Sequence, residues 1–537
     1  MGNLDIFAST AFSTRVFLSL ALSETSKHPI SNADTPVDFK TCRPETRSSQ
    51  GPFPFFLNSC VSLIQNLRTL FWNFDRNPPI GRERGQILMG AEKKTNRLLP
   101  LTAFFLLVLS ATIPCVFSAA NQSPTYRKSA QLQKFGSSAV FPLHGNVYPL
   151  GYYSVSITIG HPAKRFDLDI DTGSDLTWVQ CDAPCTGCTK PREHLYKPSN
   201  NLLGCGHPLC VAFHSPASYP CKTPDDQCDY EVEYADHGSS LGVLVNDYFP
   251  LKFTNGSRLI PRLAFGCGYD QKINGLNTPA TSGVIGLANG KASIVSQLSH
   301  LGLTRNVVGH CLSGQGGGFL FFGDDLVPSS GVMWTPMLHN SFQDHYSSGP
   351  AELVFNGKST GVKGLNMVFD SGSSYTYFNS QAYKALINLV RNDLNGKPLK
   401  YATEDQSLPI CWKGSKPFKS VGDAKNFFKP LALSFTKAKN VQLQLSPDAY
   451  LIVTKHGNVC LGILNGTEVG LGSMNIIGDI TMQDKMVIYD NENQRIGWAP
   501  TNCKRLSKVD RELCDGIYQP FVANLGILEQ HCPAFDQ

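Results

Sequence analysis

The chain lacks several patterns that mark common functional classes. No block of Lys and Arg alternates with aromatic residues, and a formal charge of +5 over 537 residues is mild, so nucleic-acid binding is not expected. The 13 histidines show no metal-ligand spacing such as His-Glu-x-x-His, so neither a metal nor another cofactor is expected. The glycine run at residues 314–318 leads into an apolar strand rather than a helix, which favours a hairpin turn over a phosphate-binding loop.

The chain does contain a repeated tetrapeptide. The segment Asp171-Thr172-Gly173-Ser174 recurs as Asp370-Ser371-Gly372-Ser373, and each copy follows a strand-like apolar run. Each copy is followed, at a similar distance, by an apolar segment that ends in glycine, at residues 284–286 and 476–478. A single copy arises by chance in roughly a few per cent of chains this long, whereas two copies in matching contexts do not. The repetition predicts two carboxylates that meet across a pseudo-twofold axis.

These features together resemble the pepsin-type aspartic protease family. The resemblance rests on the two tetrapeptides, on Trp178 shortly after the first, and on the segment EYADHGSS at 233–240. It covers about residues 140–503. The cysteine pattern and the segment from Asp171 to Cys188 are most similar to the atypical plant branch, the nucellin-like and nepenthesin-like proteins.

The resemblance implies a mainly β, bilobal fold. Two six-stranded β lobes, related by a pseudo-twofold axis, would face each other across a cleft. The N-terminal catalytic lobe is expected at 140–325 and the C-terminal catalytic lobe at 326–503. A length of 537 residues and short strands joined by turns are compatible with this architecture.

The chemistry expected of Asp171 and Asp370 is general acid–base hydrolysis of peptide bonds. Two carboxylates within hydrogen-bond distance share one proton, because both cannot ionise at low cost. The ionised member would deprotonate a water molecule while the protonated member polarises the peptide carbonyl. We therefore expect an aspartic endopeptidase with an acidic optimum that acts on protein or peptide substrates. The alternative is a catalytically silent pepsin-fold protein that acts as a binding or inhibitor protein.

The resemblance also assigns supporting roles to the neighbours of the two aspartates, whose alternative role is simple turn chemistry. Hydroxyl groups would cross-link the two loops or hydrogen-bond the carboxylates, and glycine would permit close backbone approach. The cross-linking residues are Thr172 and Ser371, the carboxylate partners are Ser174 and Ser373, and the glycines are Gly173 and Gly372.

A flap hairpin is expected to cover the cleft and bind substrate. Tyr234 resembles the flap tyrosine, because Gly238-Ser239-Ser240 supplies a hairpin tip and residues 241–245 resume an apolar strand. Trp178 would hold this tyrosine through its indole N–H. The alternatives are a packed strand tyrosine and a core tryptophan.

The N-terminal region predicts a targeting segment that begins inside the chain. Residues 1–88 show no sustained period and are interpreted as an over-extended gene model or a disordered leader. Residues 89–120 combine a basic start, an apolar run and small residues for cleavage, which indicates a secretory signal peptide. Residues 121–139 would form a short propeptide of a zymogen, and residues 504–537 a tail.

This organisation predicts a secreted protein, extracellular in the apoplast or vacuolar. The rivals are a signal anchor and an organelle transit peptide. No stable membrane insertion is expected after signal cleavage, and a monomer is expected. Glycosylation sequons lie at Asn121, Asn255 and Asn465.

Twelve of the 17 cysteines fall between Cys181 and Cys503, and this even set suits an oxidising compartment. A zinc ribbon is the cytosolic alternative. Connectivity does not follow from spacing, but the family resemblance implies six pairs. These are Cys181 with Cys185, Cys188 with Cys267, Cys205 with Cys228, Cys210 with Cys221, Cys311 with Cys503, and Cys411 with Cys460.

Overall fold

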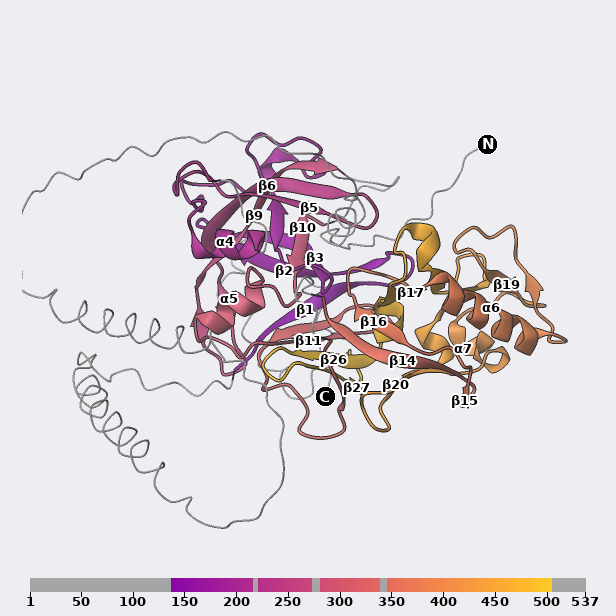
Figure 1. Ribbon diagram of the computed structural model, residues 1–537. Coiled ribbons are helices and arrows are strands. Elements are labelled where there is room, and N and C mark those ends of the chain that lie inside the picture. Colours follow the sequence, from indigo (N-terminus) through magenta and orange to yellow (C-terminus); the bar gives the residue numbers. More distant parts are fainter. Residues whose placement is uncertain (1–136, 216–220, 273–280, 339–344, 505–537) are drawn as a thin grey trace, which may run out of the picture. The chain divides into compact units, whose positions relative to one another are not determined.

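The described part of the chain is built mainly from β-strands (Figure 1), which confirms the predicted fold class. The computed structural model describes four stretches, and all of them belong to one compact unit. The expected leader, the signal peptide, nearly all of the propeptide and tail, and the sequon at Asn121 lie outside the described residues. The described stretches are 137–215, 221–272, 281–338 and 345–504.

Two large sheets form the framework, and the larger contains 13 strands. Its spatial order is β13 (Met333–Pro336), β27 (Arg495–Pro500), β26 (Lys485–Asp490), β11 (Val307–Leu312), β12 (Gly318–Phe322), β1 (Ala139–Asn146), β2 (Tyr152–Ile159), β3 (Lys164–Asp171), β10 (Gly283–Gly286), β4 (Trp178–Gln180), β9 (Arg262–Lys272), β6 (Ser239–Tyr248) and β5 (Asp229–Glu233).

The second sheet contains eight strands from the C-terminal half. Its order is β21 (Gln442–Leu445), β20 (Leu431–Phe435), β14 (Ser347–Phe355), β16 (Leu365–Phe369), β25 (Asn475–Ile477), β17 (Thr376–Phe378) and β24 (Ile463–Asn465), with β15 (Lys358–Ser359) beside β14. Two small sheets contain β18 (Lys400–Tyr401), β19 (Cys411–Lys413), β23 (Val459–Leu461) and β22 (Leu451–Val453), and β7 (Leu251–Lys252) with β8 (Arg258–Leu259).

The expectation of two six-stranded lobes was wrong in its strand count. The C-terminal hairpin β26–β27 pairs with β11 of the first sheet, with Val308 opposite Tyr489. Strand β13 then pairs with β27 at the sheet edge. Strand pairing joins segments that lie far apart in the chain, which a division by sequence position cannot foresee.

Helices are few and mostly short in the described chain. Helix α6 (Ser380–Leu394) begins where the side chain of Asn379 accepts a hydrogen bond of 3.0 Å from the amide of Ala382. It buries Leu386, Val390 and Leu394 at helical spacing. The others are α4 (Pro208–His214), α5 (Ile294–His300), α7 (Val421–Ala424), α8 (Asp479–Met482), η2 (Arg192–His194), η3 (Lys425–Phe427), η4 (Pro447–Ala449) and η5 (Gly466–Val469).

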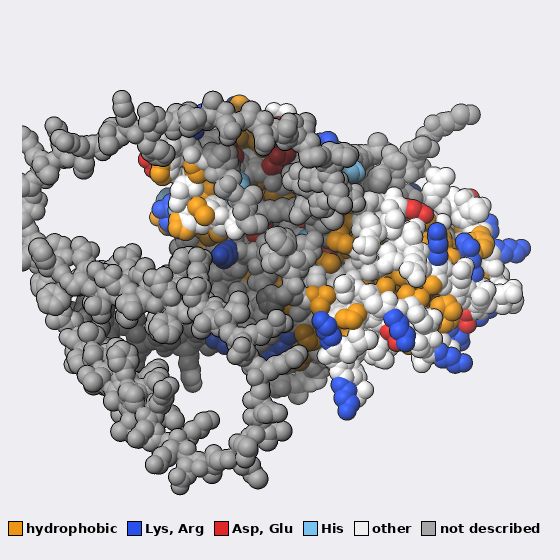
Figure 2. Space-filling view, viewed as in Figure 1, with side chains coloured by type: hydrophobic (Ala, Val, Ile, Leu, Met, Phe, Trp, Pro, Cys, Tyr) orange, Lys and Arg blue, Asp and Glu red, His pale blue; other side chains and the backbone are white. Residues whose placement is uncertain are grey.

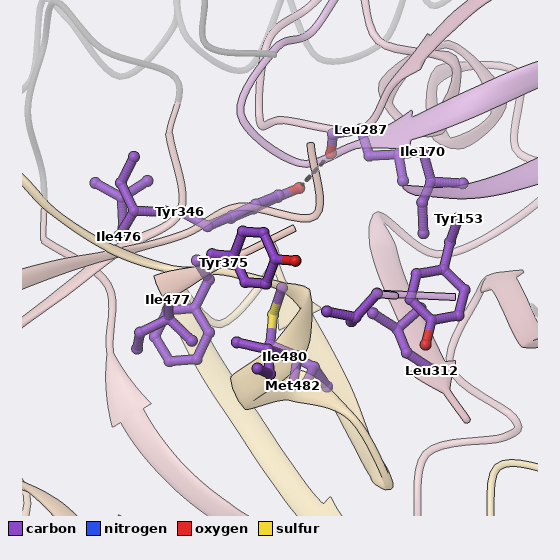
Figure 3. Close-up of a cluster of buried hydrophobic side chains, with 14 of the residues drawn as sticks. Tyr153, Ile170, Leu287, Leu312, Tyr346, Tyr375, Ile476, Ile477, Ile480 and Met482 are labelled. Carbon is purple, nitrogen blue, oxygen red and sulfur yellow. Dashed lines mark hydrogen bonds between the residues drawn. The ribbon is translucent and has the colours of Figure 1, made fainter. Parts of the chain in front are cut away.

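The largest hydrophobic core runs through residues of both large sheets. Figure 3 shows the ring of Tyr346, which directly precedes β14 of the second sheet, pointing toward Leu287, which directly follows β10 of the first. The hydroxyl of Tyr346 donates a 2.8 Å hydrogen bond to the backbone carbonyl of Leu287. Apolar packing therefore holds the two strand ends that carry the repeated tetrapeptides close to each other.

The surface and helices give no sign of a bilayer-spanning or basic docking element in the described ranges. On the face seen in Figure 2, Lys and Arg side chains are dispersed over the C-terminal half without gathering into one patch. None of the helices within these ranges is both long and apolar enough to span a bilayer.

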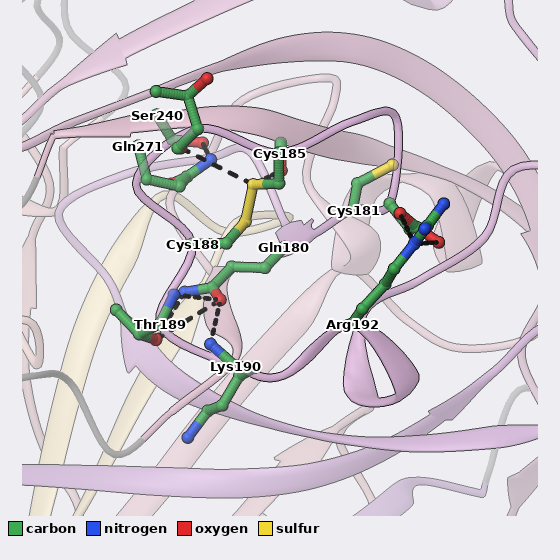
Figure 4. Close-up of a disulfide and its surroundings, with 12 residues drawn as sticks. Gln180, Cys181, Cys185, Cys188, Thr189, Lys190, Arg192, Ser240 and Gln271 are labelled. Atoms are coloured by element: carbon green, nitrogen blue, oxygen red, sulfur yellow. Dashed lines mark hydrogen bonds and ion pairs between the residues drawn. A yellow bond between two sulfur atoms is a disulfide. The ribbon is translucent and has the colours of Figure 1, made fainter.

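All 12 expected cysteines are paired, but four of the implied pairings were wrong. Cys181 directly follows β4, which runs parallel to β9, and its amide donates to the carbonyl of Gly268, so the Cα atoms of Cys181 and Cys267 lie 5.1 Å apart. Cys185 therefore closes a short loop with Cys188 instead (Figure 4). The six pairs are Cys181–Cys267, Cys185–Cys188, Cys205–Cys221, Cys210–Cys228, Cys311–Cys503 and Cys411–Cys460.

The second correction concerns two crossed pairs in the first lobe. Cys210 lies on helix α4. The amide of Cys228, which directly precedes β5, donates a hydrogen bond to the carbonyl of Leu203, and Leu203 lies shortly before the helix in the chain. The Cα atoms of Cys210 and Cys228 are 6.0 Å apart, and those of Cys205 and Cys221 are 5.9 Å apart. Both distances suit a disulfide.

Candidate active site

Asp171 and Asp370 occupy equivalent places in the two sheets. Asp171 is the last residue of β3, and Asp370 directly follows β16. Each strand has a parallel neighbour, β10 or β25, which contains the apolar segment noted downstream of each tetrapeptide. The amide of Asp370 donates to the carbonyl of Ile477 at 3.0 Å, and the amide of Leu287 donates to the carbonyl of Asp171 at 2.7 Å.

The glycines that end these two segments are required by close packing. A Cβ on Gly286 would lie 2.5 Å from the carbonyl carbon of Asp175. A Cβ on Gly478 would lie 2.0 Å from the carbonyl oxygen of Tyr375. Only glycine lets the loop that carries each aspartate pass so near to the adjacent strand.

The hydroxyls of Thr172 and Ser371 cross-link the two loops. The Thr172 hydroxyl donates to the carbonyl of Phe369 at 3.0 Å and accepts from the Ser371 amide at 2.9 Å. The Ser371 hydroxyl donates to the carbonyl of Ile170 at 3.1 Å and accepts from the Thr172 amide at 3.1 Å. This reciprocal set of four buried hydrogen bonds fixes one aspartate loop against the other.

Both carboxylates accept equivalent hydrogen bonds from their own loops. Asp171 accepts from the amide of Gly173 at 2.8 Å and from the hydroxyl of Ser174. Asp370 accepts from the amide of Gly372 at 2.9 Å and from the hydroxyl of Ser373 at 2.6 Å. Each side chain is thus held in one orientation by donors placed within three residues.

The two carboxyl groups lie next to each other. A Cβ on Gly173 would lie 2.7 Å from Oδ1 of Asp370 and 3.1 Å from Oδ1 of Asp171. The two side chains also share a hydrogen bond. Gly173 therefore has no side chain because one would fill the space where the carboxylates meet.

Burial raises the pKa of both carboxyl groups, and the charge of the partner contributes at Asp171. Burial raises the pKa of Asp171 well above its ordinary value, and the charge of Asp370 adds to the rise. Burial also raises the pKa of Asp370, while hydrogen bonds from Ser373 and Asp171 oppose that rise. Such a pair retains one proton over a wide pH range.

The predicted flap is a hairpin of β5 and β6, with Glu233 opposite Ser239. The turn occupies residues 234–238, so Ser239 and Ser240 open the returning strand rather than form the tip as expected. Its shape is fixed by a 2.8 Å hydrogen bond from the amide of Tyr234 to the carbonyl of Gly238 and by a positive φ of 65° at His237.

Trp178 and Tyr234 meet beside Asp171. The indole N–H of Trp178 donates to the hydroxyl of Tyr234 at 2.6 Å, and both side chains are buried. Burial raises the pKa of Tyr234 well above its ordinary value, and the nearby charge of Asp171 adds to this. The hairpin thus carries a neutral hydroxyl close to the paired carboxyls.

Sequence reasoning missed three titratable residues around the pair. Asp479 is 1% exposed, and neither of its carboxylate oxygens bonds another described residue. Burial raises its pKa well above the ordinary value, and Asp370, Asp169 and Asp171 add to the rise. The sequence contained a signal for Asp479. It directly follows the second Gly-ended apolar segment, whereas the first such segment is followed by the apolar residue Leu287.

The other two are Asp169 and His345. Asp169 lies on β3, where burial raises its pKa to about 7, against a 2.8 Å hydrogen bond from Thr281. Burial lowers the pKa of His345 to about 4, while its bond to the backbone of Gly173 opposes this. No local pattern distinguished this histidine from the other twelve.

The two described sequons differ in exposure. Asn255 is exposed in the turn between β7 and β8. Asn465 is 6% exposed, and its side chain accepts a 3.0 Å hydrogen bond from Ser380. This burial and hydrogen bond disfavour a glycan at Asn465 in the folded chain, and glycosylation at either sequon stays a prediction.

Comparison with known proteins agrees with this arrangement. Residues 153–324 match the family described as xylanase inhibitor N-terminal, and residues 351–500 match xylanase inhibitor C-terminal. An aspartic proteinase of Oryza sativa subsp. japonica is 44% identical over 391 residues, which covers 70% of this chain and 94% of that protein. Aspartic proteinase nepenthesin-2 of Nepenthes gracilis is 27% identical over 377 residues, covering 66% and 78%.

Solved structures share the fold at lower identity. The crystal structure of edgp aligns with a TM-score of 0.55 at 17% identity, covering 69% of this chain and 96% of that one. Basic 7S globulin from soybean aligns with a TM-score of 0.53 at 18% identity, covering 68% and 95%. With the paired aspartates and the identity to the Oryza sativa proteinase, these findings show that the chain belongs to the plant pepsin-type aspartic protease family, in its atypical branch.

Proposed function

We propose that the protein is an aspartic endopeptidase that hydrolyses peptide bonds with a water molecule activated between Asp171 and Asp370. The observation that supports this most directly is the hydrogen-bonded, buried carboxyl pair, held by donors from both loops. Every group that the mechanism requires is present, including the tyrosine on the hairpin.

In the proposed reaction, the ionised carboxylate of the pair removes a proton from the water as the water attacks the peptide carbonyl carbon. The protonated carboxyl donates a hydrogen bond to the carbonyl oxygen, which becomes a hydroxyl of the tetrahedral intermediate. The pair then gives a proton to the departing amine as the C–N bond breaks, and one hydroxyl of the intermediate returns its proton to the pair, which leaves a carboxylic acid product. The pair ends with one proton, as it began.

The residues around the carboxyl pair orient the pair and the substrate and take no part in proton transfer. Thr172 and Ser371 keep the carboxyl groups at a fixed separation, so little reorganisation is needed in the transition state. The hairpin with Tyr234 would close over a bound peptide and exclude bulk water. Trp178 positions that tyrosine through the 2.6 Å hydrogen bond.

We propose an optimum at weakly acidic pH. Below a pH of about 6, to which burial raises the pKa of Asp370, a second proton occupies the pair and no carboxylate remains to activate water. At high pH the pair loses its single proton, and the hydrogen bond to the substrate carbonyl is lost. Activity should therefore fall at pH values below and above this optimum.

A site in the secretory pathway belongs to the same proposal. Six disulfides join cysteines of the described chain, and such bonds persist in oxidising compartments. The exposed sequon at Asn255 is compatible with that route.

The test is cleavage of a denatured protein over about pH 3 to 8, with and without pepstatin. Asp171→Asn should abolish cleavage. Asp167→Asn is the matched control, because Asp167 lies on the same strand with its side chain 52% exposed. Equal cleavage by Asp171→Asn and the unmodified protein would overturn the proposal. Inactivity of the folded, unmodified protein would favour the catalytically silent alternative, an inhibitor or binding protein.

A further inference from the structure

A cavity of about 530 Å³ lies between the flap turn and residues of the C-terminal half of the chain. Ala235 and Asp236 of the flap turn line one side, and Tyr375 and Tyr377 line the other. Burial raises the pKa of Tyr377, and both Tyr375 and Asp370 add to the rise, so this tyrosine faces the catalytic pair. A peptide bound across Asp370 would place one of its side chains in this cavity.

The walls of the cavity are aromatic and carry unused hydroxyl groups. Tyr375 and Tyr377 are each 4% exposed, yet their hydroxyls hydrogen-bond to no other residue in the described ranges. Tyr383 and Tyr401 add two further rings. Nearly buried hydroxyls directed into a cavity indicate a ligand with polar atoms, and ring faces also favour a cation over an anion.

The charge of the cavity is negative. Asp405 and Glu468 line it together with Asp236, whereas no Lys or Arg is among its described lining residues. Neither Asp405 nor Glu468 takes part in an ion pair of the described chain. Arg391 lies over the ring of Tyr401, 6.0 Å from its centroid, but does not itself line the cavity, so the acidic, tyrosine-walled interior favours a positively charged group.

Asp405 keeps its charge under the conditions expected for catalysis. Burial alone would raise its pKa, but hydrogen bonds from Thr454, Asn458 and Ser407 outweigh burial and lower the pKa to about 2. The hydroxyl of Thr454 donates at 2.6 Å and the amide of Asn458 at 2.9 Å. These donors are neutral, so the negative charge remains available to a guest at acidic pH.

We propose that this cavity binds a Lys or Arg side chain of the peptide substrate, so that the enzyme cleaves preferentially beside basic residues. The inference rests on the proposed peptidase function and names its substrate class. The aliphatic stem of the side chain packs between the rings of Tyr375 and Tyr377, and the cationic group reaches Glu468 and Asp405.

The test compares short peptides that differ only by Lys or norleucine, placed in turn at each position on both sides of the scissile bond. Norleucine keeps most of the stem and lacks the charge. At one position the unmodified enzyme should cleave the Lys peptide with a kcat/KM about tenfold higher than the norleucine peptide. Glu468→Gln should reduce this ratio severalfold, and Glu468→Lys should reverse it.

Glu404→Gln is the control variant. Glu404 is an exposed carboxylate next to Asp405 in sequence, is paired with Lys413 at 2.6 Å, and lines a different cavity. This variant should keep the unmodified ratio. Because Glu468 is exposed, its substitution should not affect folding.

The outcomes separate the two proposals. Cleavage of both peptides at equal rates at every position, or an unchanged ratio in both Glu468 variants, overturns the basic pocket and leaves the peptidase standing. Cleavage of neither peptide by the folded enzyme, equal to Asp171→Asn, overturns the peptidase and the pocket together.

Discussion

Replacing Asp370 by Asn should stabilise the folded protein at neutral pH while abolishing catalysis. Burial raises the pKa of Asp370 from 3.8 to about 6. Since the folded state holds this proton more tightly than the unfolded chain, the contribution of Asp370 to stability is greatest below pH 3.8 and is lost as pH rises through about 6. At about 1.4 kcal/mol per pKa unit, the loss is about 3 kcal/mol at pH 7.

Asn removes the charge without changing the size of the side chain. Its carbonyl oxygen can still accept from the amide of Gly372, and the Ser373 hydroxyl can accept from the new amide group. The variant should therefore unfold at higher denaturant than the unmodified protein at pH 7, with a gain of about 3 kcal/mol that shrinks toward pH 4.

The assay is guanidinium unfolding at pH 4 and pH 7 for both proteins. The difference between them reports Asp370 together with its effect on the coupled Asp171, because the remaining buried acids are common to both proteins. Asp167→Asn should behave like the unmodified protein at both pH values. A variant equally stable or less stable than the unmodified protein at pH 7 would refute the argument that the buried, ionised Asp370 destabilises the folded state.

Three further variants follow from the same structure. Replacing Cys311 and Cys503 by Ser opens a loop of 192 residues and should lower the free energy of unfolding by about 5 kcal/mol in guanidinium; an unchanged value would contradict this. Trp178→Phe should lower kcat/KM about tenfold with little change in melting temperature, because the hydrogen bond to Tyr234 is lost; unchanged kinetics would exclude the positioning role. Asp479→Asn should raise stability at pH 7 but not at pH 4, since burial raises the pKa of Asp479 well above its ordinary value; equal gains at both pH values would refute that reasoning.

The local parts of the site could be predicted from the sequence because they are local in origin. A strand that alternates apolar and polar residues, followed by Asp-Thr-Gly-Ser, specifies a strand end, a turn and donors within three residues of the carboxylate. The Gly-ended apolar segments could be found for the same reason, since only glycine fits beside those turns.

Residues whose role depends on distant partners could not be predicted in this way. The disulfide of Cys181 with Cys267 depends on the parallel pairing of β4 with β9, and the side chain of Asn465 is bonded by Ser380 of a distant segment. The local sequence shows only that Asp479 follows a Gly-ended apolar segment. Its burial near Asp370, Asp169 and Asp171 in the folded chain raises its pKa. These contacts join segments tens to hundreds of residues apart, and a local pattern contains no information about them.

By itself, the sequence determined that two equivalent aspartates exist, each at the end of a strand and each with its own hydrogen-bond donors. The tertiary structure alone decided that Asp171 and Asp370 lie next to each other, because their separation depends on the hydroxyl cross-links of Thr172 and Ser371 and on the core packed beneath both loops. The pKa of a carboxyl group depends on the distance to the next charge and on the loss of solvent. Both quantities arise only when the two halves of the chain come together.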